Sequence, residues 1–415
     1  MNSYLVIILT ILIAEYVLTL AVEILNMRHV TSALPAEFQG FYDAKKYENS
    51  QNYLKAQTKF ALVKTSFFTY VTIVSILCGV FNIIDLFARS FHAHYLATAL
   101  IFGAVILLYL KLLDVPFSMY HTFVLEAKYG FNKTTLKTFV SDALKSLALT
   151  GLIGGIVFAI VVWFFTVTGR SAWLYCWAAV TLFELFLVFV APVVILPLFN
   201  KFVPLAEGEL KSAIEAYARQ QHFILKGIFT MDGSKRSTKT NAFFTGFGRF
   251  KRIALFDTLI ARHTKEELVS ILAHEIGHYA RRHVIKGLAL SIVTTGIMFF
   301  ILSFFINNLG LFEAFSMKYF SVYASIVFFG FLFTPINFIL NILSNMISRA
   351  HEYEADAFAV STYKQPQAFI DALKKLSVDS LSNLTPHPLK VFLDYSHPPV
   401  IERVRAIKEI IKKKR

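Results

Sequence analysis

The chain has 415 residues, of which 56% are hydrophobic and only 16% are charged, whereas a soluble globular chain usually carries about 25% charged residues. Together with 43 phenylalanines and long uncharged segments, this excludes a disordered chain, a collagen-like repeat and a small disulfide-linked protein. The formal net charge of +14 would suggest nucleic acid as the partner of a soluble protein. Here the basic residues lie mostly in loops between apolar segments, so we assign them to membrane orientation and expect no nucleic-acid partner.

Seven segments are apolar and long enough to cross a lipid bilayer, which takes about 20 residues of helix. They lie near residues 3–26, 65–88, 95–119, 146–168, 173–199, 287–309 and 319–347. The first segment has no Lys or Arg before its apolar run and is longer than a signal-peptide core, so we expect a retained spanning helix.

The basic residues are distributed very unequally between the two sides of the membrane. The first-to-second, third-to-fourth and fifth-to-sixth connections and the C-terminal tail hold 36 of the 41 Lys and Arg residues. The opposite side holds Arg89, Arg170 and Lys318 alone. The positive-inside rule therefore predicts an outside N-terminus, with the C-terminus and the large loops in the cytoplasm.

This layout predicts an order of four regions along the chain. Residues 1–199 hold five spans, 200–286 form a cytosolic segment, 287–347 hold two more spans, and 348–415 form a cytosolic C-terminal segment that completes the site. In the first cytosolic segment we expect a helix over 205–221 and extended segments at 227–231, 241–245 and 252–256. These three segments predict a small antiparallel sheet.

A helix with a metal-binding pattern is expected after residue 264. Thr264 and Glu267 have the spacing of a capping box, which marks a helix start. On that helix His274 and His278 are one turn apart and can direct two imidazoles at one zinc ion, while Glu275 reaches a water molecule beside it. A pair of histidines on a helix surface, without a metal, is the alternative interpretation.

A catalytic zinc needs a third protein ligand, and carboxylate is the usual partner of two histidines in metallopeptidases. The sixth span follows the motif and the seventh returns to the same side, so residues just after 347 should lie near the histidines. There Glu352 and Asp356 are four residues apart and can face the site from one helix, one as ligand and one behind it. A solvated acidic helix face is the alternative. His351 points away from Glu352, so we expect it to be exposed or packed.

At this point the chain resembles the type-I CAAX prenyl protease family, integral-membrane zinc metallopeptidases of the gluzincin group. The shared motifs are His274-Glu-Ile-Gly-His278, Arg349-x-x-Glu352-x-x-Ala-Asp356, Asn241-Ala-Phe-Phe-Thr-Gly246, Lys128-Tyr-Gly-Phe-Asn132 and Tyr395-Ser-His397-Pro-Pro-x-x-Glu-Arg403. They occur in the order of the family and cover nearly the whole chain. His351 is a departure, because the resemblance leads us to expect an aromatic residue before the metal-binding glutamate.

The resemblance implies an all-α membrane protein with seven transmembrane helices around a water-filled chamber. A cytosolic zinc metallopeptidase domain with a small β-sheet would cap it. A chamber would account for carboxylates within or near the spans, which are costly in a membrane unless they face water or partners. These carboxylates are Glu23, Asp85, Asp114 and Glu184. Pairing between helices, or a position at the membrane interface, is the alternative for each.

The expected activity is zinc-assisted peptide hydrolysis, in which Glu275 acts as base and then as acid. Asn241 and Ala242 begin a predicted edge strand along which an extended peptide could align. The resemblance implies that His397 and Arg403 approach the zinc and stabilise the oxyanion, and Asp356 would orient a zinc-binding histidine. Without the resemblance, Ser396-His-Pro-Pro399 would be interpreted as a turn before the final helix.

The expected substrates are peptides or proteins that carry a prenyl group and are cleaved near their C-terminus. A second hypothesis keeps the zinc chemistry but assigns quality control of misfolded membrane proteins, since bacterial relatives have no prenylated targets of their own. A transporter is a third, less favoured hypothesis, because it needs no zinc motif. An intramembrane protease is disfavoured by the charged residues that flank the motif.

The tail Lys412-Lys-Lys-Arg415 has lysines three and four positions from the end, as in a dilysine retrieval signal. In a eukaryote this predicts the endoplasmic reticulum membrane. In a bacterium the same charges would only anchor the tail to anionic lipid of the inner membrane. Oligomeric state does not follow from any of these patterns.

Overall fold

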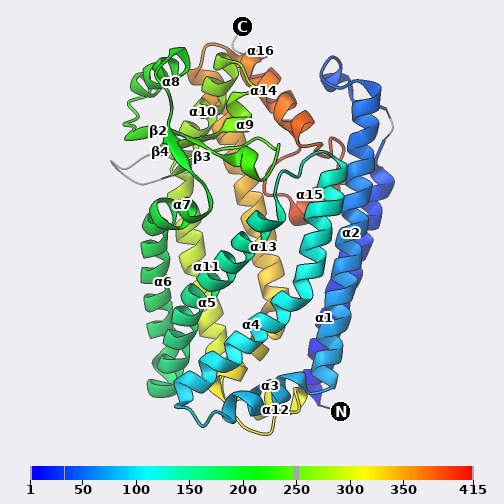
Figure 1. Ribbon diagram of the computed structural model, residues 1–415, viewed down its shortest axis with the longest axis vertical. Helices are drawn as coiled ribbons and strands as arrows, with labels where there is room; N and C mark the ends of the chain where they lie inside the picture. The colour runs from blue at the N-terminus through cyan, green and yellow to red at the C-terminus, as the bar shows by residue number, and fades with distance from the viewer. Residues whose placement is uncertain (1, 32, 246–251, 414–415) are drawn as a thin grey trace.

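The computed structural model describes residues 2–31, 33–245 and 252–413, and these are mostly helical. Within these described residues, seven helices are long and apolar enough to cross a membrane, as the sequence predicts. They are α1 (Ser3–His29), α2 (Ala44–Leu77), α4 (Tyr95–Tyr120) with η2 (His121–Glu126), α5 (Leu136–Val167), α6 (Ala172–Val190) with η4 (Ala191–Ile195) and α7 (Leu196–Phe199), α11 (His283–Phe305), and α13 (Val322–Thr362). The long helices form one end of the molecule and a smaller cap forms the other, with the two termini at opposite ends (Figure 1).

The predicted bounds of the second span, 65–88, are wrong at both ends. Helix α2 begins 21 residues earlier, at Ala44, and ends at Leu77. Gly79 then takes a left-handed conformation with φ 67° and starts a separate helix, α3 (Val80–Arg89). Glycine adopts this conformation without the steric cost that a Cβ brings, so the break is encoded at Gly79 although the apolar pattern continues across it.

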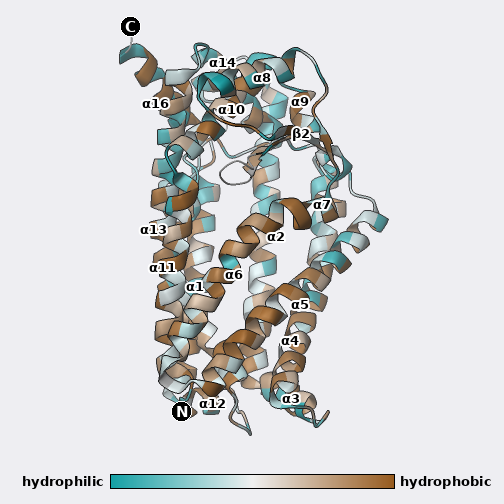
Figure 2. Ribbon diagram, turned by 90° about the vertical axis from the view of Figure 1, so that its left-hand side faces the viewer, coloured by the Kyte–Doolittle hydropathy of each residue, from teal (hydrophilic) through white to brown (hydrophobic). Residues whose placement is uncertain are grey.

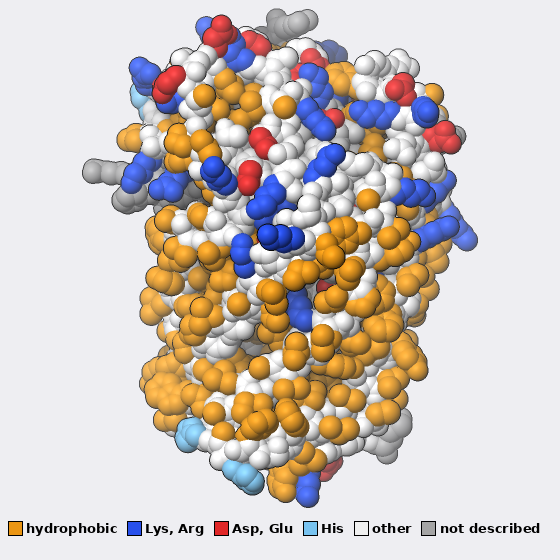
Figure 3. Space-filling model, viewed as in Figure 1, with side chains coloured by type: hydrophobic (Ala, Val, Ile, Leu, Met, Phe, Trp, Pro, Cys, Tyr) orange, Lys and Arg blue, Asp and Glu red, His pale blue; other side chains and the backbone are white. Residues whose placement is uncertain are grey.

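The seven helices form a ring rather than a bundle around a solid core. In the most apolar window of each span, between 0% and 17% of the residues are buried. A bundle packed around a solid core would bury one face of each helix. Apolar residues follow the spans along their length, whereas polar residues gather in the cap (Figure 2). The surface has the same division, with a broad apolar belt below a charged cap (Figure 3).

Three of the four carboxylates singled out in the spans are paired with basic side chains. The pairs are Glu23 with Lys390, Asp85 with Arg89 at 2.8 Å, and Asp114 with Lys64 at 2.6 Å. A paired charge costs far less in a membrane than an isolated one. Pairing therefore explains these three residues without reference to the predicted chamber.

The described part of the cap contains a mixed four-stranded sheet. Its strands are β1 (Phe202–Pro204), β2 (Gly227–Met231), β3 (Ala242–Thr245) and β4 (Arg252–Phe256), in the order β1-β2-β4-β3. The three predicted segments are confirmed as strands, but the prediction of an antiparallel sheet is wrong in one place, because β2 and β4 pair in parallel. The chain crosses over between them through β3, which pairs with β4 in the antiparallel sense at the sheet edge.

Helices pack around this sheet and complete the core of the cap. They are α8 (Glu209–Gln220), α10 (Lys265–Ala280), α14 (Pro366–Asp379) and α16 (Val400–Lys413). One hydrophobic cluster joins their buried side chains to those of β2 and β4. Helix α10 is central, since ten of its 16 residues are buried. The site helix is thus held on several sides by packing.

The remaining short elements connect these parts. They are η1 (Ala36–Phe38), η3 (Gly169–Ser171), η5 (Gly233–Lys235), α9 (Asp257–Ile260), α12 (Leu309–Ala314) and α15 (Pro388–Asp394).

Helix α13 carries the chain from the membrane into the cap without interruption. Its 41 residues correspond to a length of about 60 Å, roughly twice the thickness of the hydrocarbon core of a bilayer. The predicted boundary between 347 and 348 therefore falls within a continuous helix. The end of α13 that lies in the cap packs against α10 and brings two distant parts of the sequence together.

Candidate metal centre

Helix α10 begins with the predicted capping box. The Thr264 side chain accepts a hydrogen bond from the Glu267 backbone N–H, and the Glu267 carboxylate accepts one from the Thr264 N–H. This fixes the start of the helix two and a half turns before His274. The Nε2 atoms of His274 and His278 consequently face one another at 3.1 Å. The predicted histidine pair is therefore on one helix face.

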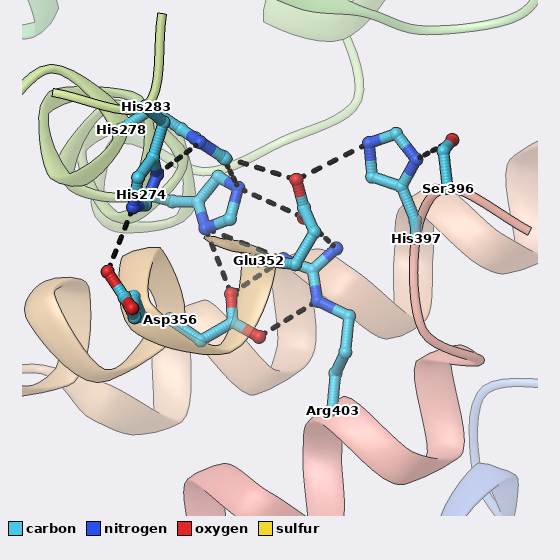
Figure 4. Close-up of polar contacts among 9 residues, drawn as sticks. His274, His278, His283, Glu352, Asp356, Ser396, His397 and Arg403 are labelled. Atoms are coloured by element: carbon cyan, nitrogen blue, oxygen red, sulfur yellow. Dashed lines mark hydrogen bonds and ion pairs between the residues drawn. The ribbon is translucent and has the colours of Figure 1, made fainter. Parts of the chain in front are cut away.

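Glu352 of α13 meets this pair from the opposite side (Figure 4). Its Oε2 lies 3.4 Å from His274 Nε2, and its Oε1 lies 3.2 Å from His278 Nε2. One ligand atom from each of the three residues can be chosen so that all lie within 4.8 Å of one another. The structure thus brings together the two histidines and the glutamate that the sequence predicts as metal ligands.

The chemistry of this group fits a bound cation. Glu352 Oε2 is buried, and its polar neighbours are His274 Nε2 at 3.4 Å and Arg403 Nη1 at 3.2 Å. Two imidazole nitrogens and one carboxylate oxygen form a donor set typical of a catalytic zinc, which leaves one position open for water or substrate. A metal ion between these groups would be held by the Glu352 carboxylate and both histidine rings.

Asp356 and Arg403 support the His274 side of the group. His274 Nδ1 lies 2.9 Å from Asp356 Oδ1, on the ring edge opposite the metal-facing Nε2. Arg403 of α16 binds Asp356 through two parallel contacts, Nη2 to Oδ1 at 2.6 Å and Nε to Oδ2 at 2.9 Å. Burial lowers the pKa of His274, but hydrogen bonds to Asp356 and Glu352 outweigh this effect, and the resulting pKa is about 9. The carboxylates therefore strongly attract a positive charge at this imidazole.

Arg403 also reaches the predicted metal ligand Glu352. Its Nη1 lies 3.2 Å from Glu352 Oε2, and its side chain is 11% exposed. One planar guanidinium therefore contacts two buried carboxylates, which a Lys ammonium group at the same place could not bind in the same way. Local sequence patterns could not predict that Arg403 contacts Asp356, because the two residues are 47 positions apart in the chain.

His397 lies at the mouth of the site. It follows α15 in the turn that leads to α16, as the Ser-His-Pro-Pro pattern predicts. Its Nε2 lies 3.4 Å from Glu352 Oε1, and its Nδ1 lies 2.9 Å from Ser396 Oγ. The side chain is 64% exposed. A ring in this position is open to a bound substrate while it remains next to the metal-ligating group.

The site opens into a pocket of about 360 Å³. The pocket is lined by Asn241, Ala242, Leu259, Ile271, His274, Glu275, His278, Glu352, Phe369, Leu373, Leu376, His397 and Arg403. All predicted site residues except Asp356 therefore line one space. Burial raises the pKa of the Glu275 carboxyl above its usual 4.5, which suits a group that must accept and return a proton.

Asn241 and the first residue of β3, Ala242, form one wall of the pocket. Among the described strands β3 pairs only with β4, so its other edge is free of any strand that the structure describes. The Asn241 carbonyl accepts a hydrogen bond from Phe256 N, and its side chain accepts one from Ala242 N. These contacts fix the start of the strand next to the metal-ligating residues.

A polar group that the sequence analysis missed anchors the segment before β3. Lys239 Nζ lies 2.9 Å from both Tyr53 OH and Glu126 Oε2, and it lies 4.4 Å from the centre of the Phe131 ring. Phe131 belongs to the motif at residues 128–132, and its carbonyl accepts a hydrogen bond from Thr238 N. That motif therefore contacts the segment that leads into β3.

Gly277 is a second residue whose importance the sequence analysis missed. A Cβ built on Gly277 would lie 3.0 Å from the Ala355 carbonyl oxygen and 3.2 Å from Phe358 Cβ. The only available signal was a glycine in the interior of a helix, which costs stability and often marks a close approach.

His351 packs within the protein, as expected. Its ring stacks on His283 with 4.0 Å between ring centres and 10° between ring planes. It contributes no atom to the three-residue metal group.

Comparison with known proteins identifies relatives over the same regions. Two family models match in succession: CAAX prenyl protease N-terminal, five membrane helices, over residues 23–201, and peptidase family M48 over residues 204–411. The probable CAAX prenyl protease 1 of Schizosaccharomyces pombe is 36% identical over 387 residues, covering 90% of this chain and 81% of the relative. The Homo sapiens CAAX prenyl protease 1 homolog is 30% identical over 424 residues, covering 91% and 89%.

The fold is also similar to a solved structure. The crystal structure of Ste24p from S. mikatae has a TM-score of 0.93 to this chain at 32% sequence identity, and the match covers 98% of this chain and 99% of that chain. The similarity therefore includes both the spanning helices and the cap. The chain belongs to peptidase family M48 and is a multi-pass membrane metallopeptidase.

Proposed function

We propose that this protein is a membrane-embedded zinc metalloendopeptidase that hydrolyses peptide bonds near the C-terminus of prenylated substrates. One observation carries the proposal. Three metal-ligating groups and a further carboxylate, that of Glu275, converge on one pocket beside the edge strand β3. This arrangement provides ligands for a metal, a base and a wall for an extended peptide in the same place.

His274, His278 and Glu352 would hold the metal, and their nitrogen and oxygen donors favour zinc. When bound, zinc polarises the scissile carbonyl and lowers the pKa of water at the site. Asp356 accepts a hydrogen bond from His274 Nδ1–H and thereby directs Nε2 toward the metal. Arg403 holds Asp356 in that orientation through its two parallel contacts.

Glu275 is the proposed general base and acid. It lies in the pocket, on the same helix as the two histidines. Its carboxylate removes a proton from the attacking water, and the same proton then passes to the nitrogen of the leaving amine as the peptide bond breaks. Burial raises the pKa of this carboxyl, and the positive charge of Arg403 lies close enough to lower it in part.

His397 and Arg403 are proposed to stabilise the negative charge that develops on the carbonyl oxygen. His397 is exposed at the pocket mouth and can donate a hydrogen bond to that oxygen. Arg403 contributes its positive charge from a fixed position, because its Nε, Nη1 and Nη2 groups contact Asp356 and Glu352.

Asn241 and Ala242 are proposed to bind the substrate backbone. An extended peptide that pairs with the outer edge of β3 would pass across the pocket, with main-chain hydrogen bonds setting its direction.

The substrate class rests on the relatives. Those of Schizosaccharomyces pombe and Homo sapiens carry the name CAAX prenyl protease 1, with high coverage of both chains. These relatives favour a prenylated substrate over general quality control of membrane proteins. The metal-ligating group argues against a transporter, which has no use for it.

The proposed orientation places the cap in the cytoplasm and the N-terminus on the other side. The basic residues concentrate on the side of the cap, as the positive-inside rule requires. The relatives named above are eukaryotic, which supports the endoplasmic reticulum membrane over a bacterial inner membrane. Lys412 and Lys413 end α16, and the rest of the predicted dilysine tail, Lys414 and Arg415, lies outside the described residues.

The proposal is tested with purified full-length protein and two reporter peptides that differ only in a prenyl group. The wild type should cleave the prenylated peptide with the higher kcat/KM, and Glu275→Gln should retain zinc but lose at least about 100-fold in kcat. Equal cleavage of both peptides would refute the substrate class. A fully active Glu275→Gln variant would refute the role of Glu275.

A further inference from the structure

The metal ligand His278 has a second polar contact on the side of its ring away from the metal group. Its Nδ1 lies 3.0 Å from His283 Nδ1, and His283 Nε2 lies 3.0 Å from Glu354 Oε2. The three side chains form a continuous chain of contacts beside the metal group, and Figure 4 shows His283 next to His278. The His283 side chain is 4% exposed, so water does not compete freely for its nitrogens.

Only one distribution of protons satisfies all of these contacts when His278 ligates a metal. Nε2 of His278 faces Glu352 and His274, so it must offer its lone pair to the metal and the proton must lie on Nδ1. This N–H then donates to Nδ1 of His283, which must be unprotonated there. The proton of His283 is consequently on Nε2, where it donates to the Glu354 carboxylate.

We propose that His283 and Glu354 are positioning residues that fix the ring orientation and tautomer of the metal ligand His278. This inference rests on the proposed metal site. Partners of this kind hold ligating histidines in other metal sites, and their removal typically weakens metal binding by about 10- to 100-fold.

The two metal-binding histidines therefore have separate supports. His274 is held by Asp356 and Arg403, on α13 and α16. His278 is held by His283, the first residue of the spanning helix α11, and by Glu354 of α13. The support of His278 thus joins the metal group directly to the start of a transmembrane helix.

The local backbone explains how His283 reaches His278 only five residues away. Arg282 adopts a left-handed conformation with φ 58°, which is rare for a residue with a side chain. This turn ends α10 and starts α11, and it directs His283 back toward the helix that it follows. The His351 ring then stacks on the face of His283 at 4.0 Å and limits its rotation.

The test measures metal affinity rather than activity, in full-length protein purified in detergent. Apparent Kd for zinc is obtained by competition with a chelating dye, and Co²⁺ binding is followed by visible absorption. Four variants alter the contacts: His283→Leu removes the acceptor, and His283→Asn keeps an oxygen near the position of Nδ1. Glu354→Leu removes the terminal acceptor, and Glu354→Gln retains one. His351→Phe is the matched control, because it keeps a stacked ring.

We expect the zinc Kd of His283→Leu to rise by about 10- to 100-fold and its Co²⁺ spectrum to change. Glu354→Leu should shift in the same direction by less. His283→Asn and Glu354→Gln should each lie closer to the wild type than the matching Leu variant, and His351→Phe should lie within about twofold. Because Glu354 is 47% exposed, its variants test the idea even if His283→Leu does not fold.

Two outcomes separate this inference from the metal site itself. Wild-type zinc affinity in Glu354→Leu and in folded His283→Leu, together with loss of zinc in Glu352→Ala, would overturn the positioning role alone. Absence of zinc from the wild type, or full retention in Glu352→Ala, would overturn the proposed metal site and this inference with it.

Discussion

Gly277 of α10 lies against Ala355 of α13 so closely that a Cβ on Gly277 would be 3.0 Å from the Ala355 carbonyl oxygen and 3.1 Å from its Cα. Both residues are next to the metal group, since Gly277 precedes His278 and Ala355 follows Glu352 by three positions. The distance between the two helix backbones therefore determines whether Glu352 reaches the histidines.

Replacing Gly277 with alanine should separate the two helices and weaken the metal site. The new methyl group would contact main-chain atoms that cannot rotate away, and overpacking of this kind typically costs about 1–3 kcal/mol. We expect lower zinc occupancy and lower peptidase activity for Gly277→Ala, measured by elemental analysis and reporter cleavage.

Gly287→Ala is the control for this substitution. Gly287 lies in α11, where a Cβ would meet no atom within 4 Å. Alanine is favoured over glycine in a helix by up to about 1 kcal/mol, so this variant should be as stable as the wild type or slightly more so. A Gly277→Ala variant that behaves like Gly287→Ala would show that the close approach is unimportant.

Arg403→Lys should weaken the site although it keeps the positive charge. A lysine ammonium group cannot make the two parallel contacts with Asp356 and also reach Glu352. We expect about a tenfold loss of zinc affinity, determined by chelator competition.

Arg405→Lys on the same helix is its control. Arg405 is 64% exposed and contacts Glu37 alone among the ion pairs described, and surface pairs contribute about 0–1 kcal/mol. Equal zinc affinities for Arg403→Lys and Arg405→Lys would contradict the supporting role of Arg403.

Lys239→Met should impair substrate binding more than the chemical step. It removes the contacts of Lys239 with Glu126 and Tyr53 that anchor the segment before β3. Because this segment leads into Asn241 and Ala242, which are proposed to bind the substrate backbone, we expect a severalfold rise in KM and a smaller change in kcat. Steady-state kinetics with the prenylated reporter measures it. Lys211→Met, which breaks an ion pair with the exposed Glu207, should leave KM unchanged.

His263 makes stability of the cap dependent on pH. Burial lowers the pKa of this histidine below its usual 6.5, although Glu267 attracts a proton to it. Between the folded pKa and about pH 6.5, the unfolded chain binds a proton at His263 that the folded chain does not. The contribution of neutral His263 to stability is therefore fully present above about pH 6.5 and falls as the pH drops toward the folded pKa.

The measurement compares unfolding midpoints of the wild type and His263→Leu in detergent at about pH 7.5 and about pH 5.5. The wild type should lose more stability on acidification than His263→Leu, whatever their absolute midpoints. The same loss in both proteins would assign the effect to other groups.

Much of the fold follows from local patterns. The seven spans appear as long apolar runs, and the start of α10 appears as a capping box, because both depend on residues close in sequence. The position of Glu352 follows from one further step. Two spans that leave and return on the same side bring residue 352 near residue 274, and the continuous helix α13 confirms it.

Other features depend on contacts between distant residues and have no local signal. The parallel pairing of β2 and β4 results from the path of the chain between them, whereas the pattern within each strand is the same for either direction. The partners of Lys239 lie more than 100 residues away. The polar first half of α2 extends beyond the apolar window that identifies the span.

The zinc content of purified protein tests the central claim most directly. The account predicts about one zinc per wild-type chain and far less in Glu352→Ala, because only two ligands would remain. Glu402→Ala, which removes a carboxylate of α16 that contacts Tyr353 outside the metal group, should retain the wild-type amount. A wild type without zinc, or equal zinc in Glu352→Ala and Glu402→Ala, would contradict the account.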